Sequence, residues 1–162
     1  MLKTAVIGAS SYIGKHLIKM YRKKFPDCIG TFFKNKSSAN KYFNLHNSSI
    51  KKLKLLETGH ESVIITAAQP NIGFCEKNKK LSYDLNVKAP LRIIKDLSKT
   101  SIKIIFLSSD YVFQGNKGNN SDYDKTNPTT NYGKQKKEVE EKIKKISKDI
   151  TILRLGKIFG LK

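Results

Sequence analysis

Short runs of apolar, β-branched residues alternate along this chain with stretches whose apolar positions recur at helical spacing. The apolar runs predict five strands, at residues 2–7, 28–33, 63–66, 102–107 and 150–155. The stretches between them predict helices over 13–24, 48–56, 80–99 and 132–148, the third of them kinked at Pro90. This alternation predicts an α/β fold, a doubly wound parallel sheet covered by helices on both faces.

Size and composition fit a single globular domain over residues 1–162. With 162 residues, 38% of them hydrophobic, the chain can bury a continuous core. No apolar run approaches the roughly 18 residues of a membrane span. The apolar block at the start, up to Ile7, is too short for a secretory signal. Cys28 and Cys75 lie far apart, as in reduced proteins, so we expect a cytoplasmic protein.

The formal net charge of +19 raises the question of nucleic-acid binding. Nearly all the basic residues are lysines spread along the chain, without an arginine cluster or a basic motif interleaved with aromatic residues. This distribution favours a solvated lysine surface, which would still attract anionic nucleotides. A basic nucleic-acid-binding domain remains the less favoured alternative.

A turn of small residues, from Gly8 to Gly14, joins the first predicted strand to the first predicted helix. Small residues let the backbone approach a pyrophosphate, and the free amides at a helix start point toward the anion. The segment therefore predicts a phosphate-binding turn, with a tight turn that binds no ligand as the alternative. Ser11 stands where a middle glycine is usual, so the loop would have to adjust if position 11 needs a positive φ.

The end of the second predicted strand bears on which dinucleotide fits. Folds that prefer NAD carry an acid there for the ribose 2′-hydroxyl, whereas the 2′-phosphate of NADP needs positive charge. Residues 31–36 contain Lys34 and Lys36 and no acid. This favours NADP over NAD.

Two further predicted strands deliver small or polar residues to one edge of the sheet. Ala67, Ala68 and Gln69 follow the strand at 63–66, and Ser108 and Ser109 follow the strand at 102–107. Open α/β sheets bind ligands at the carboxyl ends of their strands. Residues 114–131, a polar loop rich in glycine and asparagine, are a candidate mobile lid over this edge.

Tyr132 and Lys136 lie four residues apart at the start of the last predicted helix. A helix projects such a pair from one face, so the ammonium can lie close to the phenol. A nearby positive charge favours the phenolate and lowers its pKa. The pair can therefore act as a proton donor, although the same spacing arises easily by chance in a lysine-rich chain.

Several segments together resemble the extended short-chain dehydrogenase/reductase family, and within it the dTDP-4-dehydrorhamnose reductase-like branch. They are Gly8-Ala9-Ser10-Ser11-Tyr12-Ile13-Gly14, Ala67-Ala68, Asn86-Val87-Lys88-Ala89-Pro90, Leu107-Ser108-Ser109-Asp110-Tyr111-Val112-Phe113-Gln114-Gly115, Asn127-Pro128 and Tyr132-Gly133-Lys134-Gln135-Lys136. The resemblance runs through nearly the whole chain, and it implies a Rossmann-type NAD(P)-binding domain.

The resemblance further implies NADP-dependent hydride transfer at a carbonyl of a nucleotide sugar. Tyr132 would donate the proton, Lys136 would lower the pKa of Tyr132 and bind the nicotinamide ribose, and Ser109, with Ser108 as the alternative, would hydrogen-bond the developing alkoxide. The residues implied to bind the cofactor are Gly8, Ser10, Ser11, Tyr12, Ile13, Gly14, Lys34 (toward the 2′-phosphate), Asn44, Leu45, Ala67, Ala68, Gln69, Ser108, Tyr132 and Lys136.

Two departures from the family pattern bear on function. Asn44-Leu45 stands where the family often has Asp-Leu near the adenine, and an amide can still pair with the adenine amino group. Relatives of this kind continue into a second half that supplies most of the sugar-nucleotide pocket. We therefore expect a cofactor-binding and catalytic half that lacks the C-terminal substrate domain.

The resemblance leaves an alternative function open. Relatives with a similar Ser-Ser-Asp-Tyr-Val-Phe segment include the regulatory subunit of methionine adenosyltransferase, so the chain could bind NADP without catalysis and act on a partner protein. The expected partners are a nucleotide-sugar substrate and either a second copy of the chain or a regulated protein. His16, His46 and His60 lack ligand-like spacing, and no metal site is expected.

Overall fold

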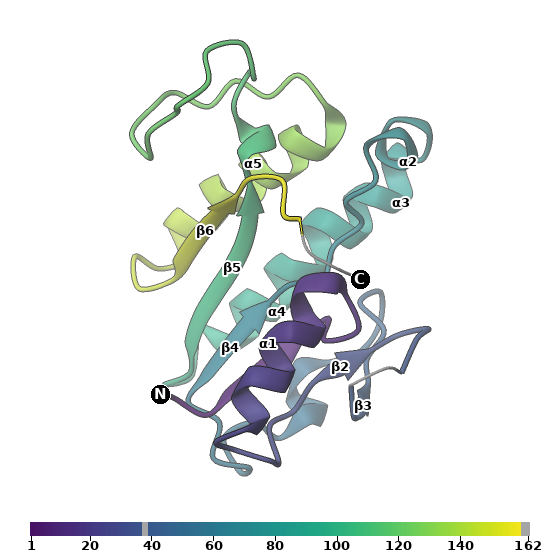
Figure 1. The fold of residues 1–162 in the computed structure, drawn as a ribbon, viewed down its shortest axis with the longest axis vertical. Coiled ribbons are helices and arrows are strands. Elements are labelled where there is room, and N and C mark those ends of the chain that lie inside the picture. The colour runs from purple at the N-terminus through teal and green to yellow at the C-terminus, as the bar shows by residue number, and fades with distance from the viewer. Residues whose placement is uncertain (37–38, 160–162) are drawn as a thin grey trace.

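A four-stranded parallel sheet with strand order β1-β4-β5-β6 organises the computed structural model, which describes residues 1–36 and 39–159 (Figure 1). The strands are β1 (Thr4–Ile7), β4 (Ser62–Ile65), β5 (Lys103–Ser109) and β6 (Thr151–Leu155). A bridge from Val6 to Gly30 brings β2 (Thr31–Phe32) to the free side of β1, and β2 pairs in parallel with β3 (Lys41–Tyr42). The predicted doubly wound parallel sheet is confirmed.

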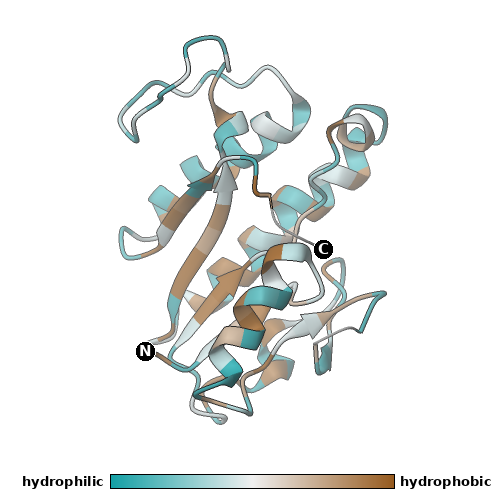
Figure 2. Cartoon of the chain, in the orientation of Figure 1, coloured by the Kyte–Doolittle hydropathy of each residue, from teal (hydrophilic) through white to brown (hydrophobic). Residues whose placement is uncertain are grey.

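Helices cover the two faces of the sheet unequally. Helix α1 (Tyr12–Arg22) packs on one face around Val6, Ala9 and Ile18. Helices α4 (Ala89–Leu97) and α5 (Asn131–Ile146) pack on the other face over the larger core, which includes Ile7, Ile65 and Phe106. The alternation of Val6 and Ile7 between the two cores follows from the two-residue period of a strand, and Figure 2 shows the apolar strands as brown ribbons at the centre.

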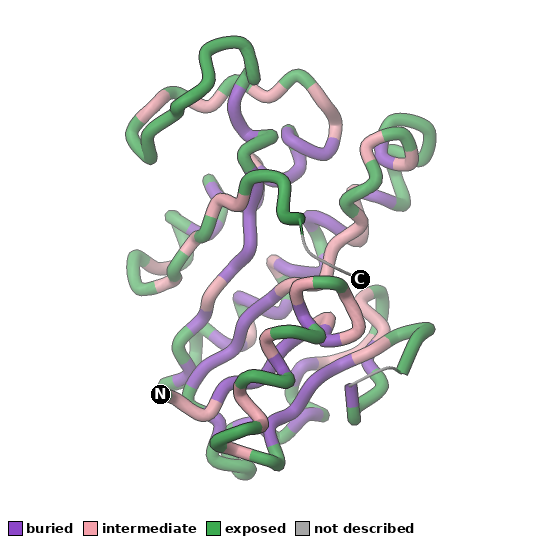
Figure 3. The backbone as a smooth tube through the Cα atoms, viewed as in Figure 1, coloured by how far each residue is buried: buried purple, intermediate pink, exposed green. Residues whose placement is uncertain are grey.

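Strand β6 forms the exposed edge of the sheet. Leu153 lies in register with Leu107 of β5, yet 42% of its surface is exposed. Figure 3 shows β6 as intermediate and exposed, in contrast to the buried β4 and β5. The residues described here therefore leave part of the α1 side of the sheet uncovered at β5 and β6.

The predicted strands and helices are confirmed in order and differ in extent. The second strand is paired only over β2, because Gly30 meets β1 through a single bridge. The predicted helix at 48–56 is wrong in length: a 3-10 helix, η1 (Ile50–Leu53), ends where Lys54 takes a positive φ of 50°. Short 3-10 turns share the i, i+3 spacing of apolar residues with helices, so periodicity alone did not separate the two.

The predicted helix at 80–99 is divided into segments. Helix α3 (Lys79–Tyr83) leads into a π-helical turn, η2 (Asp84–Lys88), and then into α4. Pro90 offers no N–H, and its ring would clash with the carbonyl four residues earlier. The amide of Ala89 instead donates to the carbonyl of Asp84, five residues back, so the expected irregularity at Pro90 takes the form of a widened turn.

One short helix had no periodic signal in the sequence. Helix α2 (Ile72–Lys77) begins where the Asn71 side chain accepts a hydrogen bond from the amide of Phe74 at 2.7 Å. Its six residues are too few to show an amphipathic period. An asparagine cap was the available signal.

His60 connects the start of β4 to the chain segment that enters β2. Its ring is buried, Nε2 accepts a hydrogen bond from the amide of Ile29 at 3.1 Å, and Nδ1 lies 2.9 Å from the Thr58 hydroxyl. Burial lowers the pKa of His60, and the positive charge of Lys3 lowers it further by a smaller amount. The neutral ring is therefore the form that the fold accommodates.

We expect His60 to make stability fall in mild acid. Because the folded pKa is depressed, the unfolded chain binds more protons below about pH 6.5, and the free energy of unfolding decreases as pH falls through that range. Urea denaturation at pH 7.5 and pH 5.0 should show that the free energy of unfolding falls less between these pH values in His60→Gln than in the unmodified protein. His16→Gln, at an exposed histidine, should retain the full loss; equal losses in all three proteins would contradict the prediction.

Candidate active site

The turn from Gly8 to Gly14 packs so closely that two of its glycines have no room for a side chain. A Cβ on Gly14 would lie 2.2 Å from the carbonyl oxygen of Gly8, and a Cβ on Gly8 would lie 2.7 Å from the amide nitrogen of Ala67. Gly8 also has a φ of +96°, which favours glycine. The turn thus brings the start of α1 against the end of β4.

Ser11 takes an ordinary extended conformation, with φ −72° and ψ 165°. Its hydroxyl caps α1 by accepting from the amide of Gly14 at 3.1 Å, and it lies 3.3 Å from the Thr66 hydroxyl. The position does not need a positive φ, so the serine substitutes for glycine without distorting the turn. The amides of Tyr12 and Ile13 have no acceptor among residues 1–36 and 39–159 and remain available to an anion.

Two cavities meet beside this turn, at Ser11 and Ala68. The first, of about 260 Å³, lies between the turn and the end of β2 and is lined by Gly8, Ser10, Ser11, Leu45, Ala67, Ala68 and Gln69 among the predicted residues. The second, of about 320 Å³, extends toward α5 and is lined by Ser11, Tyr12, Ile13, Ala68, Ser108, Ser109, Tyr132 and Lys136. Together they form a cleft along the carboxyl edge of β1, β4 and β5.

Three predicted residues do not line the cleft. Gly14 lies behind it, in the contact between α1 and the turn. Lys34 is exposed one residue beyond Phe33, which does line the first cavity. Asn44 lies beside the cavity residue Leu45, but its side-chain oxygen accepts from the amide of His46 at 2.9 Å, so it stabilises a local turn.

Helix α5 begins in close contact with the segment that follows β5. The Thr130 hydroxyl caps α5 by accepting from the amide of Gly133 at 3.1 Å. A Cβ on Gly133 would lie 2.1 Å from the carbonyl oxygen of Tyr111. Gly133 therefore permits the approach that places Tyr132 over the end of β5, a role that sequence reasoning did not assign to it.

Tyr132 and Lys136 are both buried, with 8% and 3% of their surfaces exposed. The ammonium of Lys136 lies 5.7 Å from the centroid of the Tyr132 ring, 4.6 Å from that of Phe106, and donates to the carbonyl of Leu107 at 2.8 Å. The hydroxyl of Tyr132 has no hydrogen-bond partner in the described part of the chain. The predicted pair is thus brought together at the cleft.

Burial controls the protonation of both side chains. It raises the pKa of Tyr132 to about 12, with smaller contributions from Cys75 and Asp110, and lowers the pKa of Lys136 to about 8. The pKa of Tyr132 is raised and not lowered in this structure, because desolvation of the phenolate is the largest effect on it. Tyr132 is neutral at physiological pH and able to donate its proton.

The two serines at the end of β5 face different partners. Ser108 donates to the buried carboxylate of Glu140 at 2.5 Å, whereas Ser109 donates to the carboxylate of Asp110 at 3.0 Å and accepts from the amide of Tyr111 at 3.3 Å. Glu140 also accepts from Arg154, with the shortest contact at 2.7 Å. Ser108 is therefore held within a buried ionic network, and Ser109, also buried, begins the turn beside the cleft.

A buried network of amides links the loop after β4 to helix α5. Asn86 accepts from the amide of Gln69 at 2.7 Å and donates to the carbonyl of Gln69 at 3.0 Å and to the side chain of Gln135 at 2.8 Å. Gln135 in turn donates to the Ser82 hydroxyl at 2.9 Å. Asn86 and Gln135 thus fix the cleft wall relative to Tyr132, and neither role was predicted.

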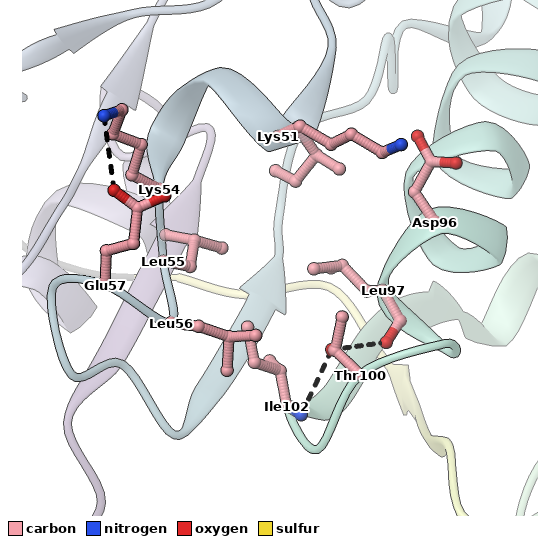
Figure 4. Close-up of a pocket in the computed structure, with 10 residues that line it drawn as sticks. Lys51, Lys54, Leu55, Leu56, Glu57, Asp96, Leu97, Thr100 and Ile102 are labelled. Carbon is pink, nitrogen blue, oxygen red and sulfur yellow. Dashed lines mark hydrogen bonds and ion pairs between the residues drawn. The ribbon is translucent and has the colours of Figure 1, made fainter.

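Another cavity, of about 210 Å³, lies at the opposite edge of the sheet, between η1 and the turn that enters β5. Figure 4 shows its apolar wall of Leu55, Leu97 and Ile102, with Lys51 directed toward Asp96 at the rim. No phenol or imidazole lines it. It lacks the convergent polar groups that a reaction would require, and the cleft at the carboxyl edge is the candidate active site.

Within residues 1–36 and 39–159, no helix is long and apolar enough to span a membrane. Over the same residues, no group of three or more His, Cys, Asp or Glu side chains is placed to hold a metal ion.

A parallel sheet of this order, a glycine turn that caps a helix, and a buried tyrosine–lysine pair at the carboxyl edge define a Rossmann-type domain of the short-chain dehydrogenase/reductase class. Residues 2–162 match the family model described as "RmlD substrate binding domain". The chain belongs to this family. The resemblance to extended short-chain dehydrogenases/reductases of the dTDP-4-dehydrorhamnose reductase-like branch is confirmed.

Individual relatives agree with this membership. A hypothetical dTDP-4-dehydrorhamnose reductase from Sulfolobus tokodaii superposes with a TM-score of 0.85 at 26% identity, over 98% of this chain and 57% of that one. Methionine adenosyltransferase 2 subunit beta of Xenopus tropicalis is 23% identical over 98% of this chain and 47% of its own length. The chain spans about half the length of the curated relatives it matches.

Two further solved structures show the likeness of fold alone. A dTDP-4-dehydrorhamnose reductase from Bacillus anthracis in complex with NADP has a TM-score of 0.79 at 23% identity, over 96% of this chain and 54% of that one. MoeE5 in complex with UDP-glucose and NAD has a TM-score of 0.78 at 20% identity, over 94% and 52%.

The burial of Lys136 predicts a gain in stability when its charge is removed. Below pH 8 the Lys136 ammonium is charged in both the folded and the unfolded state, so folding carries the full cost of burying that charge. From pH 8 to about 10.4 the lysine is neutral in the folded state and still protonated in the unfolded state, so the free energy of unfolding rises with pH. Lys136→Met should raise the free energy of unfolding at pH 7 by about 1–3 kcal/mol, and the gain should vanish above about pH 10.

Chemical denaturation at pH 7, 9 and 10.5 measures this gain. Lys134→Met, at an exposed lysine on the same helix, should change the free energy of unfolding by less than about 0.5 kcal/mol at each pH. A Lys136→Met protein that is less stable at pH 7 would show instead that the hydrogen bond to Leu107 outweighs the cost of burying the charge.

Proposed function

We propose that this chain is the cofactor-binding and catalytic half of a cytoplasmic, NADP-dependent reductase that acts on a carbonyl of a nucleotide sugar. The observation that supports this most directly is the placement of Tyr132, Lys136 and Ser109 in one cleft with the amides at the start of α1. In such a cleft a phosphate, a hydride donor and a proton donor can lie in line along the carboxyl edge of the sheet.

A nicotinamide dinucleotide fits the residues present. The crowded glycines at positions 8 and 14 leave a backbone cradle against the free amides of Tyr12 and Ile13, where a pyrophosphate would be held. Leu45 and Ala67 would contact the adenosine in the cavity beside β2. The bound nicotinamide would supply the hydride.

The chain's own groups account for the remaining chemistry. Neutral Tyr132 would donate its proton to the carbonyl oxygen, and Ser109 would hydrogen-bond the same oxygen as negative charge develops. Lys136 would hold positive charge beneath the phenol and bind the ribose hydroxyls. The hydrogen bond from Ser108 to Glu140 favours Ser109 over Ser108 for this role.

We propose NADP over NAD because the end of β2 carries Lys34 and no acid. Lys34 is exposed beside the mouth of the first cavity, where it can turn toward a 2′-phosphate. The complexes of related folds with NADP and with NAD support a nicotinamide dinucleotide in general.

Calorimetric titration tests both parts of the cofactor proposal. NADPH should bind more tightly than NADH, and Lys34→Glu should weaken NADPH binding about tenfold or more while leaving NADH binding within about threefold. Lys52→Glu, an equal change of charge on η1, should alter neither affinity by more than about threefold. No binding of either dinucleotide at millimolar concentration would refute the cofactor site.

Turnover tests the role of Tyr132. With NADPH and dTDP-4-dehydrorhamnose, Tyr132→Phe should lower kcat by about 10²–10⁴-fold with NADPH affinity preserved, because only the proton donor is removed. Tyr123→Phe, at a fully exposed tyrosine, should keep full activity. Equal activity in the unmodified protein and Tyr132→Phe would exclude the phenol as the proton donor.

A non-catalytic function is the alternative, and the relative named methionine adenosyltransferase 2 subunit beta supports it. In that case the dinucleotide would bind without turnover, and the chain would act on a partner enzyme. Cosedimentation with a methionine adenosyltransferase catalytic subunit distinguishes the two. A stable complex with unchanged NADPH binding and no reductase activity would favour regulation.

A further inference from the structure

A buried acidic residue, Glu140, lies one helical turn after Lys136 on α5. Each of the two residues has 3% of its surface exposed. Within residues 1–36 and 39–159, the ammonium of Lys136 forms no ion pair, and it donates to the uncharged carbonyl of Leu107 at 2.8 Å. The proposed reaction gives a task to Lys136 and none to Glu140.

The carboxylate of Glu140 is held by groups from two strands of the sheet. Arg154 of β6 donates to it from Nη2 at 2.7 Å and from Nε at 3.1 and 3.2 Å. The hydroxyl of Ser108, on β5, donates to it at 2.5 Å. A guanidinium that donates through two nitrogens fixes the orientation of a carboxylate as well as its distance. The negative charge of Glu140 therefore has a defined position beside the cleft.

The contacts of Glu140 and Lys136 with β5 are adjacent. Lys136 donates to the main-chain carbonyl of Leu107, and Glu140 accepts from the side chain of the next residue, Ser108. Successive turns of α5 are thus joined to successive residues of β5. A displacement of the Glu140 carboxylate would therefore also move the carbonyl that holds the ammonium.

Stability alone gives a weak reason for burying the pair of Glu140 and Arg154. The cost of removing two charges from water cancels much of their attraction, and apolar residues of similar size often stabilise a protein equally well. Only 14% of the Arg154 side chain and 3% of the Glu140 side chain are exposed, so water solvates neither charge well. A buried charge next to the proposed proton donor is better explained by its effect on the site.

The charge of Glu140 acts on Lys136 in the direction that the proposed reaction needs. Burial lowers the pKa of Lys136 to about 8, although the carboxylate of Glu140 acts to raise it. When the O–H bond of Tyr132 breaks and its proton passes to the carbonyl oxygen, a buried phenolate remains. Positive charge on Lys136 stabilises that phenolate, and a neutral lysine would not.

Other ionisable groups near Lys136 do not replace Glu140. Those around the cleft are Arg154 on β6, Asp110 and Tyr111 on the 3-10 turn η3 (Asp110–Val112), Cys75 on α2, and Tyr12 and Tyr132. Asp110 is exposed to solvent and accepts from the Ser109 hydroxyl. Burial raises the pKa of the Cys75 thiol, so that it carries no charge near pH 7. Glu140 is therefore the buried carboxylate available to Lys136.

We propose that Glu140 is a positioning residue for the proposed reaction: it keeps positive charge on Lys136 and, through Ser108, fixes the carbonyl that holds the ammonium. Arg154 orients the carboxylate. The inference rests on the proposed function of Tyr132 and Lys136. The charge of Lys136 can nevertheless be measured without cofactor or substrate.

An NMR titration of the free protein measures that charge. The ε-methylene signal of Lys136 in ¹³C-lysine-labelled protein is assigned by its loss in Lys136→Met, and exposed lysines titrate near ~10.4. The paired change Glu140→Gln with Arg154→Met removes both charges, so that neither is left buried without a partner. In this variant the titration midpoint of Lys136 should fall from about 8 by about one pH unit or more.

A matched control removes another ion pair from the same helix. Glu138 and Lys142 form a partly exposed pair on α5, with atoms 2.6 Å apart. Glu138→Gln with Lys142→Met should move the midpoint of Lys136 by less than about 0.3 pH unit, because water and salt screen these charges. Arg154→Lys, which keeps a cation beside the carboxylate, should also leave the midpoint within about 0.3 pH unit. Circular dichroism confirms that each variant is folded.

The pH dependence of turnover with NADPH and dTDP-4-dehydrorhamnose tests the link to the reaction. Because Lys136 must be charged, kcat should fall as pH rises through the Lys136 midpoint. In the paired variant this fall should move to lower pH by about the same amount as the NMR midpoint. Absence of turnover in the unmodified protein would refute the proposed function, and the NMR midpoint would then decide whether Glu140 controls the charge of Lys136.

Three results would overturn the proposal. An unchanged Lys136 midpoint in the folded paired variant would show that the charge of Glu140 does not act on the ammonium. A midpoint that rises would show that the charge of Arg154 has the larger effect. A loss of kcat by the same factor at every pH would assign the pair of Glu140 and Arg154 to stability alone.

Discussion

The buried polar face of helix α5 is the constraint on which this structure depends. Lys136 and Glu140 project from it toward the sheet and Gln135 toward α3 and η2, and each needs a partner because an unpaired buried charge or amide costs several kcal/mol. Lys136 finds the carbonyl of Leu107, and Glu140 finds Ser108 together with Arg154 of β6. These contacts are all made in one orientation of α5 about its axis, and in that orientation Tyr132 points into the cleft.

The same network joins parts of the cleft that come from distant segments of sequence. Asn86, in the π-helical turn before Pro90, holds both the main chain of Gln69 and the side chain of Gln135. The wall of the cleft at Gln69 and the helix that carries Tyr132 are thereby fixed to one another. Removing one partner of the Glu140–Arg154 pair would cost about 3–5 kcal/mol and disturb the cleft near Ser108 as well as the fold.

The sequence could predict what depends on local pattern and could not predict what depends on partners far along the chain. Apolar runs located all four strands of the main sheet, because a buried parallel strand must be apolar on both faces. The turn at Gly8 and the pair at Tyr132 and Lys136 were found because strand, turn and helix fix their position. Asn86 gave no comparable signal, since a buried amide is recognised only from the groups around it.

The protonation of the Tyr132–Lys136 pair shows why spacing alone misled. Two side chains four residues apart are neighbours in any helix, but whether the pKa of the phenol falls or rises depends on how far both groups are exposed to water. Exposed, the ammonium would dominate and lower the pKa of the phenol. Here both groups are buried, so desolvation dominates and favours the neutral form of each. A neutral phenol suits proton donation to a carbonyl, and binding of a polar cofactor over Lys136 would return to the ammonium the solvation it lost on folding.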